Sequence, residues 1–148
     1  MARTIKYIAV HCTASSQRAT IRDLEREFAA KGWKNPGYHY VVMTDGRVVQ
    51  MLTDDKVSNG VKGFNSACIN VAYIGGIDAE GKSIDNRTPE QKTALATLVA
   101  RLRQTYPTAV VRGHRDFSPD LNGDGKITRS EWIKDCPCFD AGAEYGEV

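Results

Sequence analysis

Residues 5–13 have the sequence IKYIAVHCT, which joins a candidate strand to a histidine and a cysteine. Residues 5–10 form a short, largely apolar run with β-branched members, which is typical of a strand buried within a sheet. His11, Cys12 and Thr13 follow this run directly, so we expect the strand to end there. The imidazole of His11 is then carried to a strand terminus, at the edge of the predicted sheet.

Further segments also have the composition of strands, namely residues 38–43, 47–52, 69–74 and 109–112. Asp45-Gly46 lies between the first two, and this dipeptide favours a tight hairpin because glycine accepts a positive φ. The last segment leads directly into Gly113 and His114. A second histidine is therefore expected at the end of a strand.

An amphipathic helix is predicted after the first strand. Thr20 can cap its N-terminus, and Ile21, Leu24 and Phe28 repeat on one face. Gly32 is placed to close the helix, because glycine readily adopts the left-handed conformation found at helix ends. The helix is expected to be about three turns long.

A second helix has the clearest boundaries in the sequence. Thr88 supplies an N-cap, Pro89 occupies the first helical position, and Gln91 can reach back to the cap. Apolar residues then repeat at helical spacing, namely Leu95, Leu98, Val99 and Leu102. Pro107 ends the helix.

Strands interleaved with two helices predict an α/β fold with a central mixed β-sheet flanked by helices. With 148 residues, the chain has the length of one ordinary domain, so we expect a single domain over residues 1–148. Hydrophobic residues make up 41% and charged residues 26% of the chain, a balance that excludes a disordered protein.

The net charge of +2 is not concentrated in any run of Lys or Arg, so charge gives no support to nucleic-acid binding. No apolar window approaches the length of a membrane span, and the N-terminus lacks an apolar stretch long enough for a signal peptide. We therefore expect no nucleic acid and no membrane as partners. The protein is expected to be a monomer that stays in the cytoplasm until another protein releases it.

The cysteines are Cys12, Cys68, Cys136 and Cys138. Because no secretory signal accompanies them, free thiols or metal ligands are expected rather than a disulfide framework. Cys136 and Cys138 are only two residues apart. A disulfide between cysteines at this spacing would be strained, so we expect one of them to be a metal ligand and the other not to bind the metal.

Zinc-type ligands occur in three segments at the ends of predicted elements, at His11, His114 and Cys136. Two imidazoles and one thiolate fill three corners of a tetrahedron and leave the fourth for water, as in catalytic zinc sites. These residues are far apart in sequence, however, and a single histidine or cysteine is more often a packed or surface residue than a ligand. Spacing alone leaves both interpretations open, and Cys138 is an alternative thiolate.

Four short motifs follow one another along the chain: VHCTA at residues 10–14, GYHY at 37–40, GHRD at 113–116 and KDCP at 134–137. The series resembles the zinc-dependent N-acetylmuramoyl-L-alanine amidases shared by small phage lysozymes and peptidoglycan recognition proteins. GHRD alone is a weak match, but four motifs in the same order are specific. The resemblance extends over residues 5–140, nearly the whole chain.

The resemblance implies an enzyme that hydrolyses the bond between N-acetylmuramic acid and L-alanine in peptidoglycan, with zinc on His11, His114 and Cys136. It also implies an active-site phenol at Tyr38 and a nearby cation at Lys134. Zinc lowers the pKa of a bound water to about 7, and a phenol or cation beside it would stabilise the developing oxyanion. Lys134 lies two residues before Cys136, so a short extended segment would turn both side chains the same way.

The alternative function is a peptidoglycan-binding module of the same fold without catalysis. The cysteine at position 136 favours the enzyme, because the two functions differ at the third zinc ligand. The lack of an export signal suggests a phage or prophage endolysin that acts on the cell wall after release. His39 would point away from Tyr38 on a strand, so we expect a structural role for it.

The chain departs from the resembled family ahead of KGFN, residues 62–65. Many relatives carry a histidine just before this segment, as part of the substrate groove, whereas here residues 58–61 are SNGV. Lys62 and Asn65 remain candidates for substrate binding. The alternative for both is an ordinary polar loop.

A second metal motif lies at residues 120–131, DLNGDGKITRSE, which fit the EF-hand calcium-loop pattern throughout. The expected calcium ligands are Asp120, Asn122, Asp124, the main-chain carbonyl of Lys126 and both carboxylate oxygens of Glu131. No entering helix is predicted before the loop, so a calcium-sensing EF-hand protein is a weaker interpretation. We expect a structural calcium clasp that orders the segment carrying Lys134 and Cys136; a polar surface insertion is the alternative.

Overall fold

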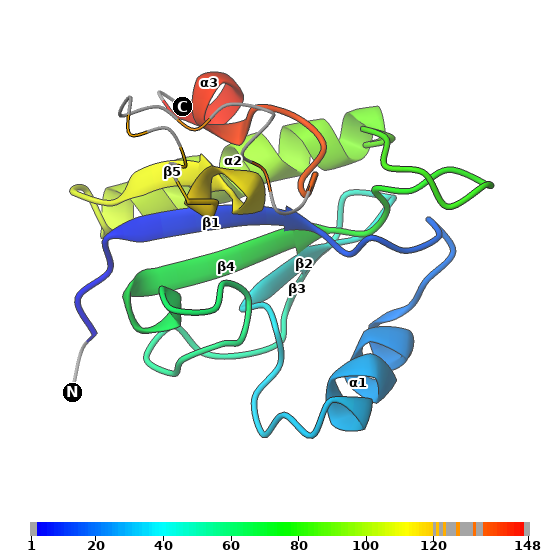
Figure 1. Cartoon of the computed structure of the whole chain (residues 1–148), viewed down its shortest axis with the longest axis horizontal. Coiled ribbons are helices and arrows are strands. Elements are labelled where there is room, and N and C mark those ends of the chain that lie inside the picture. Colours follow the sequence, from blue (N-terminus) through cyan, green and yellow to red (C-terminus); the bar gives the residue numbers. More distant parts are fainter. Residues whose placement is uncertain are drawn as a thin grey trace.

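A mixed sheet forms the centre of the protein in the computed structural model, which describes residues 3–119, 121, 123, 127, 132 and 135–146 (Figure 1). Its strands are β1 (Tyr7–Cys12), β2 (Tyr40–Val42), β3 (Val48–Gln50), β4 (Cys68–Tyr73) and β5 (Val110–Gly113). Their order across the sheet is β3-β2-β4-β1-β5. Neighbouring strands are parallel except β2 and β3, which are antiparallel. The predicted α/β fold with a central mixed sheet is confirmed.

The first predicted strand is confirmed as β1, which ends at Cys12 as expected and begins at Tyr7 rather than Ile5. β1 includes His11 and Cys12, because they pair with Ala72 and Tyr73 of β4. The predicted hairpin is present as β2 and β3, with shorter strands than expected, and Gly46 adopts a φ of +91° at its turn. His11 therefore lies inside the sheet ladder, one residue before the strand ends.

The first predicted helix is confirmed as α1 (Ile21–Ala30). The side chain of Thr20 accepts the backbone N–H of Asp23 at 3.2 Å, and the Asp23 carboxylate accepts the N–H of Thr20 at 2.9 Å. Leu24 and Phe28 are buried on the inner face. Gly32 follows the helix with a φ of +76°, as its predicted closing role requires.

The second predicted helix is confirmed as α2 (Pro89–Thr105), with Thr88 and Gln91 forming the expected capping box. The amide of Gln91 also donates to the main-chain oxygens of Val42 and Ile74, at 3.2 and 3.0 Å. One residue thus caps the helix and attaches it to the sheet. No helix in the described ranges is long and apolar enough to span a membrane.

Helices cover both faces of the sheet: α2 and the short α3 (Ala141–Tyr145) lie on one face and α1 on the other (Figure 1). The short α3 was not predicted, because five residues are too few to show a helical period. Ile8 and Val10 of β1 pack into the core beneath α2. Because side chains alternate along a strand, His11 points to the opposite face. Two 3₁₀ turns are also present, η1 (Asn65–Ala67) and η2 (His114–Phe117).

Candidate metal centre

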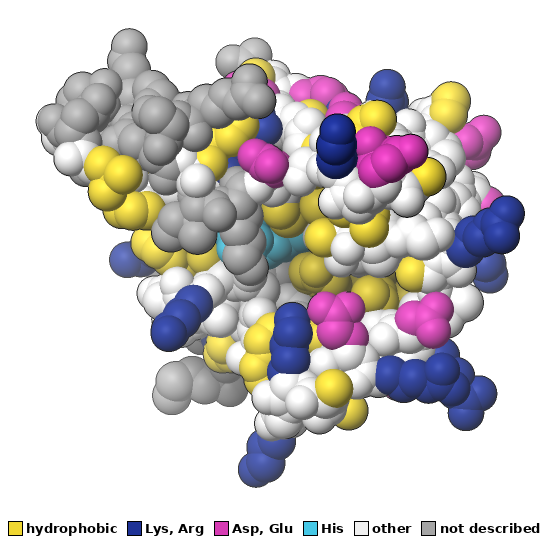
Figure 2. Space-filling view, turned by 45° about the vertical axis from the view of Figure 1, so that its right-hand side comes forward, with side chains coloured by type: hydrophobic (Ala, Val, Ile, Leu, Met, Phe, Trp, Pro, Cys, Tyr) yellow, Lys and Arg dark blue, Asp and Glu magenta, His cyan; other side chains and the backbone are white. Residues whose placement is uncertain are grey.

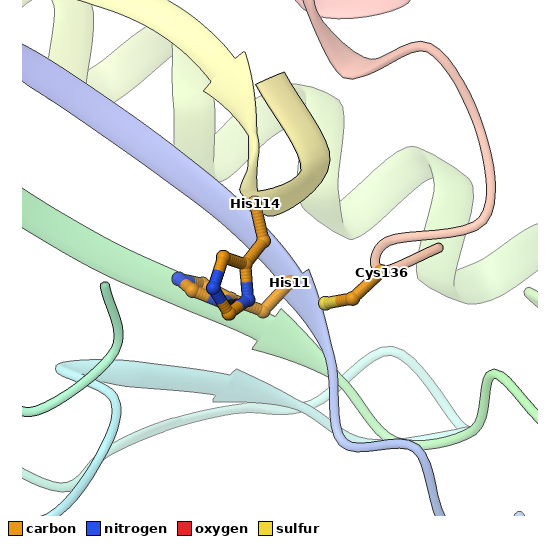
Figure 3. A group of neighbouring side chains, drawn as sticks. All are labelled: His11, His114 and Cys136. Atoms are coloured by element: carbon orange, nitrogen blue, oxygen red, sulfur yellow. Dashed lines mark hydrogen bonds between the residues drawn. The ribbon is translucent and has the colours of Figure 1, made fainter. Parts of the chain in front are cut away.

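Two parallel strands bring the candidate histidines together. Val10 of β1 pairs with Gly113 of β5, so the residues that follow them, His11 and His114, become neighbours at the carboxyl edge of the sheet. Their Nδ1 atoms are 3.2 Å apart, although 103 positions separate them in the sequence. Figure 3 shows both imidazoles meeting at this edge, with His114 at the start of η2.

Cys136 completes a cluster with the histidines, and its sulfur points toward the imidazoles (Figure 3). One ligand atom from each residue lies within 4.8 Å of the others. The backbone N–H of Cys12 donates to the Cys136 sulfur at 3.1 Å, and that of Arg115 donates to the Cys136 carbonyl at 2.8 Å. The neighbours of both histidines along the chain therefore hold the cysteine in place.

The geometry of this cluster suits a tetrahedral metal ion such as zinc. Zinc–nitrogen bonds of about 2.0–2.1 Å place two tetrahedral nitrogen ligands about 3.3 Å apart. The 3.2 Å separation of the histidine Nδ1 atoms is close to that edge. The sulfur needs only a small approach to complete the third corner, since all three ligand atoms already lie within 4.8 Å. The cluster can hold a metal ion with residues of the types and positions that the sequence indicated.

The cluster faces a hollow of about 150 Å³ between the sheet edge and α1. A neighbouring hollow of about 430 Å³ shares Trp33, Gly60 and His114 with it and extends past Lys62. Histidine surface is visible at the bottom of this depression in Figure 2. The two hollows form a continuous groove, which we call the histidine groove, with the candidate metal ligands at one end.

Tyr38 lies in the same hollow, as expected for an active-site phenol. Its ring centroid is 5.3 Å from that of His11, and its hydroxyl donates to the carbonyl oxygen of Cys12 at 3.3 Å. Burial raises the pKa of the Tyr38 hydroxyl well above its ordinary value. The phenol therefore stays protonated near neutral pH and can act only as a hydrogen-bond donor or acceptor, not as a phenolate base.

The other cysteines near the cluster are thiols outside it. All four cysteines of the chain are free of disulfides, as expected. The Cys138 sulfur lies 4.0 Å from that of Cys12 and donates to the carbonyl of Gly76. Its hydrogen bond to Cys12, together with burial, raises the pKa of Cys138. A hydrogen bond with Cys136 and burial likewise raise the pKa of Cys12, to about 12. Cys136 is thus better placed than Cys138 to act as a ligand.

The two candidates for substrate binding differ in position. Lys62 lines the histidine groove beside His114. The side-chain oxygen of Asn65 instead accepts the backbone N–H of Val61 at 2.6 Å and holds the loop in shape. Lys62 therefore lies at the groove, whereas the side-chain carbonyl of Asn65 is bonded within its own loop.

His39 does not face the groove: it is completely buried and hydrogen bonded within the protein, in agreement with the structural role expected for it. Trp33, Asn59 and Gly60 also line the groove, although nothing in the sequence indicated it. They lie in irregular segments, where no periodic pattern indicates which way a side chain points.

The remaining predicted site residues lie outside the described part of the chain. They are Lys134, proposed as the cation near the metal, and the expected calcium ligands Asp120, Asn122, Asp124, Lys126 and Glu131. Both interpretations therefore stay predictions from the sequence.

Solved structures of an endolysin, an amidase and a PGRP share this fold. The Ph2119 endolysin of a Thermus scotoductus bacteriophage superposes with a TM-score of 0.71 at 26% identity, over 93% of this chain and 79% of that one. Drosophila PGRP-LB superposes with a TM-score of 0.70 over 99% of this chain and 82% of its own, but its 14% identity shows a common fold alone.

This chain belongs to the N-acetylmuramoyl-L-alanine amidase family, whose model matches residues 1–137. Among curated relatives, the endolysin of Enterobacteria phage K11 is 36% identical over 133 residues, which are 88% of this chain and 79% of the relative. The amidase resemblance drawn from the four sequence motifs is confirmed.

Proposed function

We propose that this protein is a zinc-dependent endolysin that hydrolyses the amide bond between N-acetylmuramic acid and L-alanine in peptidoglycan. The observation that carries the proposal is the convergence of His11, His114 and Cys136 within 4.8 Å at one end of a groove, in a chain of the amidase family. The enzyme would be made in the cytoplasm and act after release to the cell wall.

The three residues would supply two neutral nitrogens and one thiolate sulfur, and leave one tetrahedral position open to the groove. When bound, zinc polarises a carbonyl group and lowers the pKa of a water to about 7. Cys136 is suited to the anionic ligand, because the N–H of Cys12 donates to its sulfur at 3.1 Å and would stabilise its negative charge.

Two further residues would act on the substrate rather than on the metal. The hydroxyl proton of Tyr38, which is directed at the Cys12 carbonyl at 3.3 Å, would turn to the oxygen on which negative charge develops as the amide is attacked. Lys134 would place a positive charge near the same oxygen, an assignment that rests on the KDCP motif alone. Lys62 would contact the part of the peptidoglycan that lies along the histidine groove.

Removing and restoring the metal tests this function. Purified protein should contain one zinc ion per chain and should release stem peptides with new L-alanine N-termini from peptidoglycan. A strong chelator should abolish release, and added zinc should restore it. Binding to peptidoglycan without new N-termini, in zinc-loaded protein, would instead support a non-catalytic module, the alternative that the cysteine at position 136 disfavours.

We also propose that residues 120–131 bind calcium as a structural clasp, a proposal that rests on the EF-hand pattern of the sequence. Calcium bound only by the folded protein would stabilise it by roughly 2.7 kcal/mol at a hundredfold excess over the dissociation constant. The melting temperature should therefore rise with calcium. No direct part in bond cleavage is expected, because a fully ligated calcium has no open position for a substrate.

The control for calcium binding is a variant with Asp124→Ala and Glu131→Ala, in which the rise in melting temperature should disappear. Activity of this variant should also be weaker at low metal concentration. A wild-type melting curve and activity that are both insensitive to calcium would assign the segment to the polar-insertion alternative.

A further inference from the structure

A row of buried polar side chains crosses the sheet beneath the candidate metal centre. Asn70 of β4 and His39, which precedes β2, are completely buried, as is Ser58 in the loop beyond the hairpin, and His11 is only 1% exposed. His39 and Asn70 are neighbours across the two strands, since the N–H of His39 donates to the carbonyl of Asn70 at 2.8 Å. Buried polar groups are retained only where they are hydrogen bonded.

The hydrogen bonds of His39 define which of its nitrogens carries the proton. The backbone N–H of Asn70 lies 3.0 Å from Nδ1 of His39, and an amide N–H can only donate. The carbonyl oxygen of Lys56 lies 2.8 Å from Nε2, and a carbonyl can only accept. The Arg3 guanidinium also lies close, with Nη2 3.2 Å from Nε2 of His39, but this nitrogen donates to the carbonyl of Asp54 at 2.8 Å. His39 is therefore neutral, with its proton on Nε2, and burial and the positive charge of Arg3 both lower its pKa.

This tautomer sets the direction of the next hydrogen bonds. Ser58 Oγ lies 3.1 Å from the unprotonated Nδ1 of His39, so its hydroxyl donates there and shares this acceptor with the backbone N–H of Asn70. The Ser58 oxygen then accepts from Asn70, whose Nδ2 is 2.6 Å away. With its nitrogen turned to Ser58, the Asn70 amide presents its oxygen to Nε2 of His11, at 2.8 Å.

We propose that Asn70, Ser58 and His39 are positioning residues that hold His11 in the tautomer with Nε2 protonated and Nδ1 unprotonated. Nδ1 is the atom that lies 3.2 Å from His114 in the candidate metal centre. A flipped Asn70 amide would donate to Nε2 of His11, which would put the proton on Nδ1 and prevent it from binding a metal. The direction of the hydrogen bonds along Asn70, Ser58 and His39 therefore decides whether His11 can be a ligand.

The surrounding backbone also fits Asn70 closely. A Cβ atom built on Gly60 would lie only 2.4 Å from Cγ of Asn70, so the loop can close over the amide only with glycine at this position.

Hydrogen bonds such as that from His11 to Asn70, made by the second nitrogen of a metal-binding histidine, commonly contribute about 10- to 100-fold to metal affinity. The inference rests on the proposed function, because it assigns these residues to the zinc ligand His11.

Zinc affinity, measured by competition with a chelator, tests the inference on the full chain. Asn70→Leu should weaken zinc binding about 10- to 100-fold, whereas Asn70→Asp, which keeps an acceptor for His11, should restore most of the affinity. Gln91→Leu is the matched control: it removes another completely buried amide, bonded to the carbonyls of Val42 and Ile74. It should lower the melting temperature and leave zinc affinity unchanged.

Nitrogen NMR of the zinc-free protein provides a readout independent of metal binding. His11 should carry its proton on Nε2 in the wild type, and Ser58→Ala should increase the Nδ1-protonated form even if Asn70→Leu fails to fold. A wild-type His11 protonated on Nδ1, or wild-type zinc affinity in Asn70→Leu, would overturn the inference. Wild-type protein that binds no zinc would overturn the proposed function, while the NMR result would still decide the role of the row.

Discussion

Cys136→Ser is expected to lose most of its zinc and nearly all amidase activity. Serine is a poor zinc ligand at neutral pH, because its hydroxyl remains protonated where a cysteine thiolate binds the metal. Loss of a ligand should reduce zinc affinity by more than the roughly 100-fold that loss of a supporting hydrogen bond can cause. Zinc content after dialysis and release of stem peptides measure the two effects.

Cys138→Ser is the matched control, since it changes a thiol two residues away whose sulfur contacts Cys12 and Gly76. It should retain both zinc and activity. Equal loss of zinc in the two variants would contradict the assignment of Cys136 as the thiolate. Full zinc binding by Cys136→Ser would remove the cysteine from the site altogether.

Tyr38→Phe should keep its zinc and its fold but lose about 10²-fold in kcat, the typical effect of removing one hydrogen-bond donor to an oxyanion. The ring remains in place beside His11, so only the hydroxyl is tested. Lys134→Ala should behave similarly if its charge acts on the same oxygen. Steady-state kinetics on soluble peptidoglycan fragments, with zinc content measured in parallel, provide the comparison.

A Tyr38→Phe variant with unchanged kcat would limit this phenol to packing against His11 and bonding the Cys12 carbonyl. A raised KM with unchanged kcat would instead indicate that the hydroxyl binds the ground state and the transition state equally. Loss of activity in only one of the two variants would identify that residue as the main partner of the oxyanion.

Most of the fold could be predicted because its elements have strong local patterns. Thr88, Pro89 and Gln91 define the start of α2, and the apolar run before His11 defines β1, since capping and strand burial depend on neighbours in the sequence. Short and irregular elements could not be predicted in this way. α3 has only five residues, and Trp33 and Gly60 reach the groove from segments without a period.

Local sequence patterns were enough to indicate which chemical groups are available and that two histidines lie near strand ends. Two histidines directly follow or finish apolar runs, and four ordered motifs indicate the amidase family, which the family match confirms. These features are local, so they can be recognised in the sequence without knowledge of the fold. Spacing alone left Cys136 and Cys138 as alternative thiolates.

How these groups meet depends on contacts between segments that are distant in the sequence. The parallel register of β1 and β5 places His11 beside His114, and the backbone of Cys12 and Arg115 holds Cys136 rather than Cys138 toward them. The row from His39 to Asn70 could not be predicted, because an asparagine within an apolar strand gives no indication of its partners on other strands. Hydrogen bonds between distant segments depend on strand order and register, which are set by packing of the whole sheet.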